Sequence, residues 1–261
     1  MLGRRPFLHA TLAGTGCLVC AGLAAGALSG AAYAADAPGL VQGPGYTLRS
    51  IGSQREAIMM GRRDARLDLH MLRGLPHLCG LGPIEGLAGE VTILDGRPSL
   101  ARVGEDGALR IEEAFDVGVP FFVWAEVAGW RTLPVPDALR SYAELELFVG
   151  EAGRAAGLTQ AFPFTVTGAP AGVAFHVVNA KPGAAMPANM AAHAAEQVNY
   201  ALAGRQATLV GFWSAEHAGV FTPMDSRMHV HLQTAANDVS GHVDGLNLGG
   251  GGMVLRLPMP A

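Results

Sequence analysis

Lysine is almost absent from this chain of 261 residues, in which Lys181 is the only one. Charged residues make up 15% of the sequence, the formal net charge is -4 at pH 7, and basic residues form no run or stripe. Proteins that bind nucleic acid usually present a basic surface, so we expect no nucleic-acid partner. A Schiff-base mechanism would rest on one candidate residue and has little support.

Cysteine is also scarce. Cys17 and Cys20 lie within the first 34 residues, and Cys79 is the only other cysteine. Removal of residues 1–34 would therefore leave no partner for an intramolecular disulfide. Cys79 sits in an apolar stretch, Leu78-Cys79-Gly80-Leu81, and we interpret it as a small buried hydrophobic residue and not as a nucleophile.

Residues 1–34 have the pattern of an export signal. Arg4-Arg5-Pro6-Phe7-Leu8 is a twin-arginine start, an apolar run of small residues extends to Ala32, and Ala32-Tyr33-Ala34 offers a cleavage site. A twin-arginine signal is an address and not an anchor. We expect a periplasmic or secreted protein that begins at Ala35 and has no stable membrane association after cleavage. An uncleaved membrane anchor is the alternative.

The remaining chain, residues 35–261, is rich in turn-forming residues. The whole sequence has 36 glycines and 16 prolines, and half of it is apolar. This composition indicates many turns and short strands and excludes a helical bundle. The length suits one large domain or two small ones. We find no internal repeat, and Gly249–Gly252 lacks the strand-then-helix context of a phosphate-binding loop.

Local patterns predict several elements. We expect a leader without regular structure over 35–50, a helix within 53–73, a loop over 181–195, and a helix from Ala138 to about Ala155 that Asp137 caps. Residues 162–168 and 173–179 are expected to pair as a hairpin. The other expected strands are 91–94 with a tight turn at Asp95-Gly96, 120–127, 208–213, 228–233, 241–248 and 253–257.

Three histidines have the spacing of a metal site. His229, His231 and His242 form an H-x-H-x10-H pattern. Side chains two apart on a strand point to the same face, and a hairpin return would bring His242 beside the first two. Three neutral imidazoles with an open position are a typical catalytic zinc site. The sequence therefore predicts a site for zinc or another divalent metal.

The other histidines lack this spacing. They are more typical of surface or satisfied core positions, and only His176 and His217 deserve further consideration. The set comprises His9, His70, His77, His176, His193 and His217.

Three blocks of the chain together resemble the acetolactate decarboxylase family. The first runs from Gly80 to Gly96, the second is Thr208-Leu209-Val210-Gly211-Phe212-Trp213-Ser214, and the third joins His229-Val230-His231-Leu232 to Ser240-Gly241-His242-Val243. The closing Leu255-Arg256-Leu257-Pro258 also resembles a family strand, and the agreement spans about residues 66–258. The chain is identified as a divergent member.

The resemblance implies a fold and a set of roles. It implies a mixed, β-rich α/β fold with mixed or antiparallel sheets, a few helices and two packed subdomains of about 50–160 and 161–261, with the metal near their junction. It implies that His229, His231 and His242 bind zinc and that Glu90 is an acid beside the metal. The implied reaction converts 2-acetolactate to acetoin through a metal-stabilised enediolate.

The sequence also departs from the family. The family has an active-site arginine after the equivalent of Gly168, but no arginine occurs here between Ala155 and Tyr200. Lys181 is the nearest cation that could replace it, although lysine is a point charge and not a bidentate fork. The family also has a glutamate in a C-terminal tail, whereas no glutamate follows His242 here.

These departures leave three functional hypotheses open. The chain is an acetolactate decarboxylase with an altered pocket, a relative that acts on another keto or hydroxy acid, or a non-catalytic protein that binds a metal or a small molecule. We expect a small-molecule substrate, and the chain is a possible homodimer.

Overall fold

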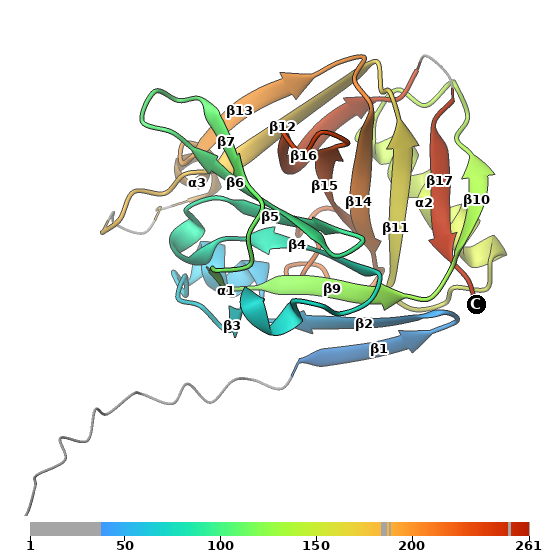
Figure 1. The fold of residues 1–261 in the computed structure, drawn as a ribbon, viewed down its shortest axis with the longest axis horizontal. Helices are drawn as coiled ribbons and strands as arrows, with labels where there is room; N and C mark the ends of the chain where they lie inside the picture. Colours follow the sequence, from blue (N-terminus) through green and yellow to red (C-terminus); the bar gives the residue numbers. More distant parts are fainter. Residues whose placement is uncertain (1–37, 184–186, 188, 250–251, 261) are drawn as a thin grey trace, which may run out of the picture. The chain divides into compact units, whose positions relative to one another are not determined.

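The computed structural model describes residues 38–183, 187, 189–249 and 252–260. The expected export signal, with Cys17 and Cys20, lies outside these residues. The described residues all belong to one compact unit, and the division at about residue 160 stays a prediction. Two large antiparallel sheets, one two-stranded sheet and a few helices form this unit (Figure 1), which confirms the β-rich mixed fold.

The first sheet has seven strands in the order β1-β2-β9-β4-β5-β6-β7, and each strand is antiparallel to its neighbours. The strands are β1 (Gly39–Gly43), β2 (Tyr46–Ile51), β4 (Leu78–Pro83), β5 (Glu90–Leu94), β6 (Arg97–Val103), β7 (Leu109–Glu112) and β9 (Phe122–Val127). Asp95 and Gly96 join β5 to β6 with φ values of 50° and 78°. Positive φ at both residues is the requirement of a type I′ hairpin turn, so the predicted tight turn is confirmed.

The second sheet has eight strands in the order β10-β17-β11-β14-β15-β16-β12-β13, again antiparallel. The strands are β10 (Trp130–Pro134), β11 (Phe162–Gly168), β12 (Gly172–Val178), β13 (Gln197–Leu202), β14 (Ala207–Trp213), β15 (Met228–Thr234), β16 (Ser240–Asn247) and β17 (Val254–Pro258). Strands β3 (Leu67–Asp68) and β8 (Gly118–Val119) form a separate two-stranded sheet.

The two large sheets share one hydrophobic core. Leu48, Leu81 and Val123 of the first sheet cluster with Phe164 and Phe212 of the second, all at most 1% exposed. Helix α2 (Tyr142–Ala155) contributes Leu145 and Val149 to the same core. The functional side chains described below therefore project from two sheets that pack against each other.

Three local predictions are wrong. Residues 39–51 form β1 and β2 and are not an unstructured leader. Of residues 53–73, which were predicted to be helical, only Gln54–Met59 form an α-helix (α1) and Leu69–Leu72 a single 3-10 turn. Gly61 follows α1 with φ of 67°, and a helix cannot continue through that conformation. Strands β11 and β12 are formed as expected, but they do not pair; β11 lies between β14 and β17, whereas β12 lies between β13 and β16.

One helix boundary and one predicted loop also differ from expectation. Helix α2 begins after Ser141 and not after Asp137, because Ser141 and Glu144 form a reciprocal capping box. The short helix α3 (Met190–Ala194) interrupts the loop predicted over 181–195. Within the described ranges, no helix is long and apolar enough to span a bilayer.

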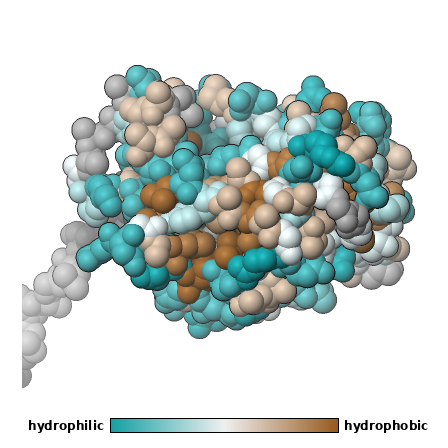
Figure 2. Space-filling view, turned by 90° about the horizontal axis from the view of Figure 1, so that it is seen from above, coloured by the Kyte–Doolittle hydropathy of each residue, from teal (hydrophilic) through white to brown (hydrophobic). Residues whose placement is uncertain are grey.

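The surface carries a few exposed hydrophobic side chains. Figure 2 shows hydrophobic patches bordered by hydrophilic residues on one face of the molecule. The large exposed hydrophobic residues are Leu40, Met59, Met60, Met71, Leu147 and Met224. These exposed side chains do not test whether the chain forms a homodimer, which stays a prediction.

Candidate metal centre

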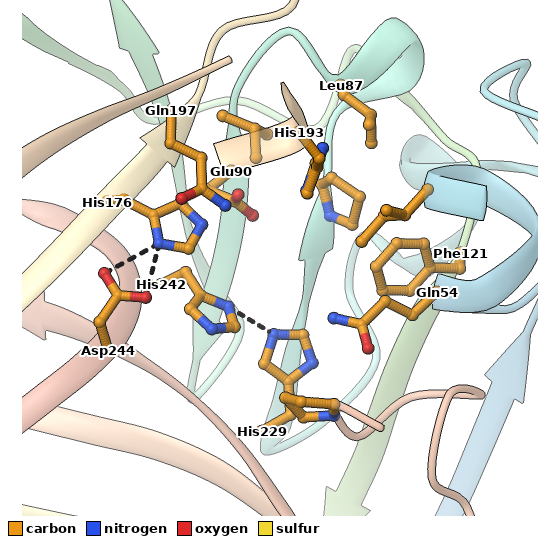
Figure 3. A pocket seen from close by; sticks show the side chains of 14 residues that line it. Gln54, Leu87, Glu90, Phe121, His176, His193, Gln197, His229, His242 and Asp244 are labelled. Carbon is orange, nitrogen blue, oxygen red and sulfur yellow. Dashed lines mark hydrogen bonds and ion pairs between the residues drawn. The ribbon is translucent and has the colours of Figure 1, made fainter. Parts of the chain in front are cut away.

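The three predicted histidines converge on one point. His229 and His231 lie on β15, and His242 lies on β16, where it is the direct cross-strand partner of His231. The ring centroid of His242 lies 4.7 Å from that of His229 and 5.4 Å from that of His231. One nitrogen of each ring lies within 4.8 Å of the others, and Figure 3 shows His229 and His242 facing each other. The predicted histidine hairpin is confirmed.

Hydrogen bonds fix the orientation of two of these rings. His229 Nδ1 donates to the Phe221 carbonyl oxygen at 2.8 Å, and His231 Nδ1 lies 3.0 Å from Thr92 Oγ1. Each contact engages Nδ1, so the Nε2 atom faces the centre, where His229 Nε2 lies 2.9 Å from His242 Nδ1. His231 Nε2 is buried and has no hydrogen-bond partner in the described part of the chain. A buried polar atom without a partner is costly, and a metal ion would satisfy it.

Burial keeps the histidines neutral. Desolvation lowers the pKa of His229 to about 4 and lowers the pKa values of His231 and His242 well below their usual range. The neighbouring rings lower the pKa of His231 and His242 further, because a second imidazolium nearby would be repelled. Neutral imidazole is the form that binds a metal, so the triad could hold a metal ion.

Glu90 reaches the same centre from the opposite sheet. It is the first residue of β5 and is 3% exposed, and its Oε2 lies 3.7 Å from His231 Nε2. Burial raises the pKa of Glu90 to about 7, although His176 and a backbone hydrogen bond from Val178 oppose this rise. The predicted acid and the predicted ligands are therefore adjacent.

A cavity of about 190 Å³ opens onto these residues. Glu90, His229 and His242 line it, and its other polar lining residues are Gln54, His176, His193, Gln197 and Asp244. The lining residues include no arginine or lysine within the ranges that the structure describes.

Sequence reasoning missed part of this lining. His193 and Asp244 were not candidates, and His176 was considered without a role. His176 pairs with His242 across β12 and β16, a contact that depends on strand order and has no signature in residue spacing. His217, the other histidine considered, lies outside the cavity lining, where its Nδ1 is 2.7 Å from Ser214 Oγ and its ring stacks on Phe221.

Lys181 lies three residues beyond the end of β12 and is exposed. It is not one of the cavity-lining residues, whereas Val178 is. The role predicted for Lys181 at the substrate carboxylate stays a prediction.

Comparison with known proteins agrees with the geometry. The family model described as alpha-acetolactate decarboxylase matches residues 53–256. No curated protein sequence gives a significant match.

Solved structures give the same fold. An alpha-acetolactate decarboxylase from Bacillus subtilis strain 168 superposes with a TM-score of 0.60 at 17% identity, over 81% of this chain and 85% of that one. The acetolactate decarboxylase of Bacillus subtilis subspecies spizizenii gives 0.63 at 18% identity, over 81% and 85%. A Staphylococcus aureus protein described as similar to alpha-acetolactate decarboxylase gives 0.63 at 18%, over 80% and 84%. With the family model matched over well more than half of its length, this chain belongs to the alpha-acetolactate decarboxylase family.

Proposed function

We propose that this chain is an exported, metal-dependent decarboxylase that converts 2-acetolactate to acetoin and carbon dioxide. The observation that carries the proposal is the buried triad of His229, His231 and His242 beside the buried Glu90. Membership of the family and the fold shared with the two Bacillus subtilis decarboxylases support it. The reaction, the identity of the metal and export are all parts of this proposal.

The residues fit a divalent ion, with zinc as our choice. Three nitrogen ligands with space for further ligands are typical of catalytic zinc, and His231 Nε2 has no other partner within the described residues. When bound, the ion would supply Lewis-acid stabilisation of negative charge on the substrate oxygens.

Glu90 is suited to deliver the proton that the reaction requires. Loss of carbon dioxide leaves an electron pair on the former C2 carbon, and this carbon must take up one proton. Glu90 is buried beside the triad and lines the cavity in which the substrate would lie, and this position within reach of the reacting carbon is what a general acid requires. Solvent then restores the proton to Glu90.

Replacement of Glu90 by glutamine tests this role. The amide keeps the shape of the side chain but cannot donate the proton, so we expect acetoin formation to fall by about 10²–10⁴-fold while the bound metal remains. Elemental analysis and acetoin formation from racemic acetolactate would be measured on the same preparation. Unchanged turnover in Glu90→Gln would show that Glu90 is structural.

A second candidate function follows from the absence of arginine and lysine in the described cavity lining. A decarboxylase must hold the carboxylate of its substrate, and a guanidinium is the usual group for this purpose. The chain could instead act on another keto or hydroxy acid, or bind a metal or small molecule without catalysis. Full metal loading without acetoin formation would favour these alternatives.

A further inference from the structure

We propose a second divalent-cation site beside the triad, formed by His176, Asp244 and the shared His242. His176 Nδ1 lies 2.8 and 2.9 Å from the two carboxylate oxygens of Asp244. One ligand-type atom from each of the three side chains lies within 4.8 Å of the others. All three side chains line the same cavity as Glu90 (Figure 3).

The spacing around His242 supports the proposal. The ring centroid of His176 lies 4.6 Å from that of His242, and the corresponding distance from His229 to His242 is 4.7 Å. His242 therefore has a histidine neighbour on each side at nearly the same distance. His229 and His242 in the first site are therefore no closer together than His176 and His242 in the second.

The strand register explains how this arrangement arises. His176, His242 and His231 are direct cross-strand partners on β12, β16 and β15, so they form one lateral row across the sheet. The β12–β16 register shifts between Ala174 and Phe175, and Asp244 is the β16 residue left without a partner there. Bulges of this kind redirect side chains, often beside functional sites. Here the unpaired Asp244 contacts His176.

The ligand set suits a divalent first-row metal. Two imidazoles and one carboxylate bind such ions and leave positions open for water or substrate. The Asp244 side chain is 42% exposed and that of His176 is 7% exposed, so the site is accessible from one side.

His242 can serve both ions through different ring nitrogens. Its Nδ1 lies 2.9 Å from His229 Nε2; if Nδ1 serves the triad, Nε2 is the ring nitrogen that would serve the second ion. When both nitrogens bind a metal, the N–H proton of His242 passes to solvent.

A second cation would supply the positive charge that the described cavity lining lacks. A role for this charge in holding a substrate carboxylate rests on the proposed decarboxylase function. The second cation site does not rest on that function, because its geometry is independent of the reaction.

A simpler alternative is that Asp244 only orients His176 through a hydrogen bond. Asparagine could keep that hydrogen bond, but its neutral amide oxygen is a much weaker ligand for a first-row divalent ion than the carboxylate oxygen of Asp244. Asp244→Asn therefore separates the two explanations.

The experiment is a metal count on the mature protein. Protein stripped with a chelator would be equilibrated with Zn²⁺ by dialysis, and bound zinc would be measured by elemental analysis, with circular dichroism as the check of folding. We expect two ions per chain in the parent and one in Asp244→Asn. Asp116→Asn is the matched control, since Asp116 is exposed and pairs with Arg73 in the first half of the chain, and it should retain two.

The double variant His229→Ala/His231→Ala should keep one ion, held by His176, Asp244 and His242. One ion in the parent that persists unchanged in Asp244→Asn would overturn the second site, and so would a folded double variant without zinc. Two ions in a protein that forms no acetoin would contradict only the decarboxylase function. Acetoin formation by a parent that binds one ion would contradict only the second site.

Discussion

Thr92 links the two sheets at the metal centre. Its hydroxyl oxygen lies 3.0 Å from His231 Nδ1 and accepts a hydrogen bond from Ser240 Oγ at 2.9 Å. Thr92 belongs to β5 in the first sheet, whereas His231 and Ser240 belong to the second. When His231 binds a metal through Nε2, its ring proton must lie on Nδ1, and Thr92 Oγ1 is the atom that would accept it.

Thr92→Val should therefore weaken metal binding. Valine has nearly the same shape but cannot accept the hydrogen bond, and loss of such a partner typically lowers metal affinity about 10–100-fold. A Zn²⁺ titration against a competing chelator would measure it. Thr165→Val is the matched control, because the Thr165 hydroxyl is buried and has no hydrogen-bond partner among the described residues. Equal affinities in the two variants would refute a positioning role for Thr92.

The residue scale also shows how far the sequence alone could predict the site. The H-x-H-x10-H spacing was sufficient to predict that the three histidines converge. Side-chain alternation along a strand and the return of a hairpin are both local rules. Glu90 could be assigned only through resemblance, since it arrives from a different sheet. His176 and Asp244 depend on the position of β12 beside β16, which no local rule provides.

At the scale of elements, local signals succeeded where a single turn decides the outcome. The Asp95-Gly96 turn and the β15–β16 hairpin were predictable for this reason, whereas the predicted Asp137 cap of α2 was wrong because Ser141 forms the capping box instead. The pairing of 162–168 with 173–179 failed because strands adjacent in sequence need not be adjacent in a sheet. The glycine, proline and alanine content of residues 35–50 predicted a leader, but Tyr46 and Leu48 are buried in the structure.

The capping box of α2 offers a test at this scale. Ser141 accepts a hydrogen bond from the Glu144 backbone, and the Glu144 side chain accepts one from the Ser141 backbone. Ser141→Ala should lower the free energy of unfolding by about 1 kcal/mol, whereas Ser141→Gly should lower it by only a few tenths. Denaturant titration would measure both. Equal stability of the alanine variant and the parent would mean that the cap contributes nothing to folding.

At the scale of the whole molecule, the proposed export signal lies outside the residues that the structure describes. We predict that a change of Arg4 and Arg5 to lysine leaves the precursor in the cytoplasm, because the paired arginines are the address. Fractionation of cells that express the parent and the variant would measure this. Normal export of the variant would mean that another route is used.

The packing of the two large sheets brings the proposed acid and the proposed metal ligands together. The first sheet supplies Glu90 and Thr92, and the second supplies the three histidines. Neither sheet holds the complete site, so the sheet packing that buries the core also sets the distance between the acid and the ligands.

The most direct test of this account is acetoin formation from racemic acetolactate by the mature protein, measured with full metal loading, after chelation and after metal is restored. We predict weak but measurable activity that is lost on chelation, returns with Zn²⁺, and is absent in His242→Ala. The cavity lining offers no arginine or lysine among the described residues, which is why we expect the rate to be low. A fully loaded, folded protein that forms no acetoin would contradict the decarboxylase function.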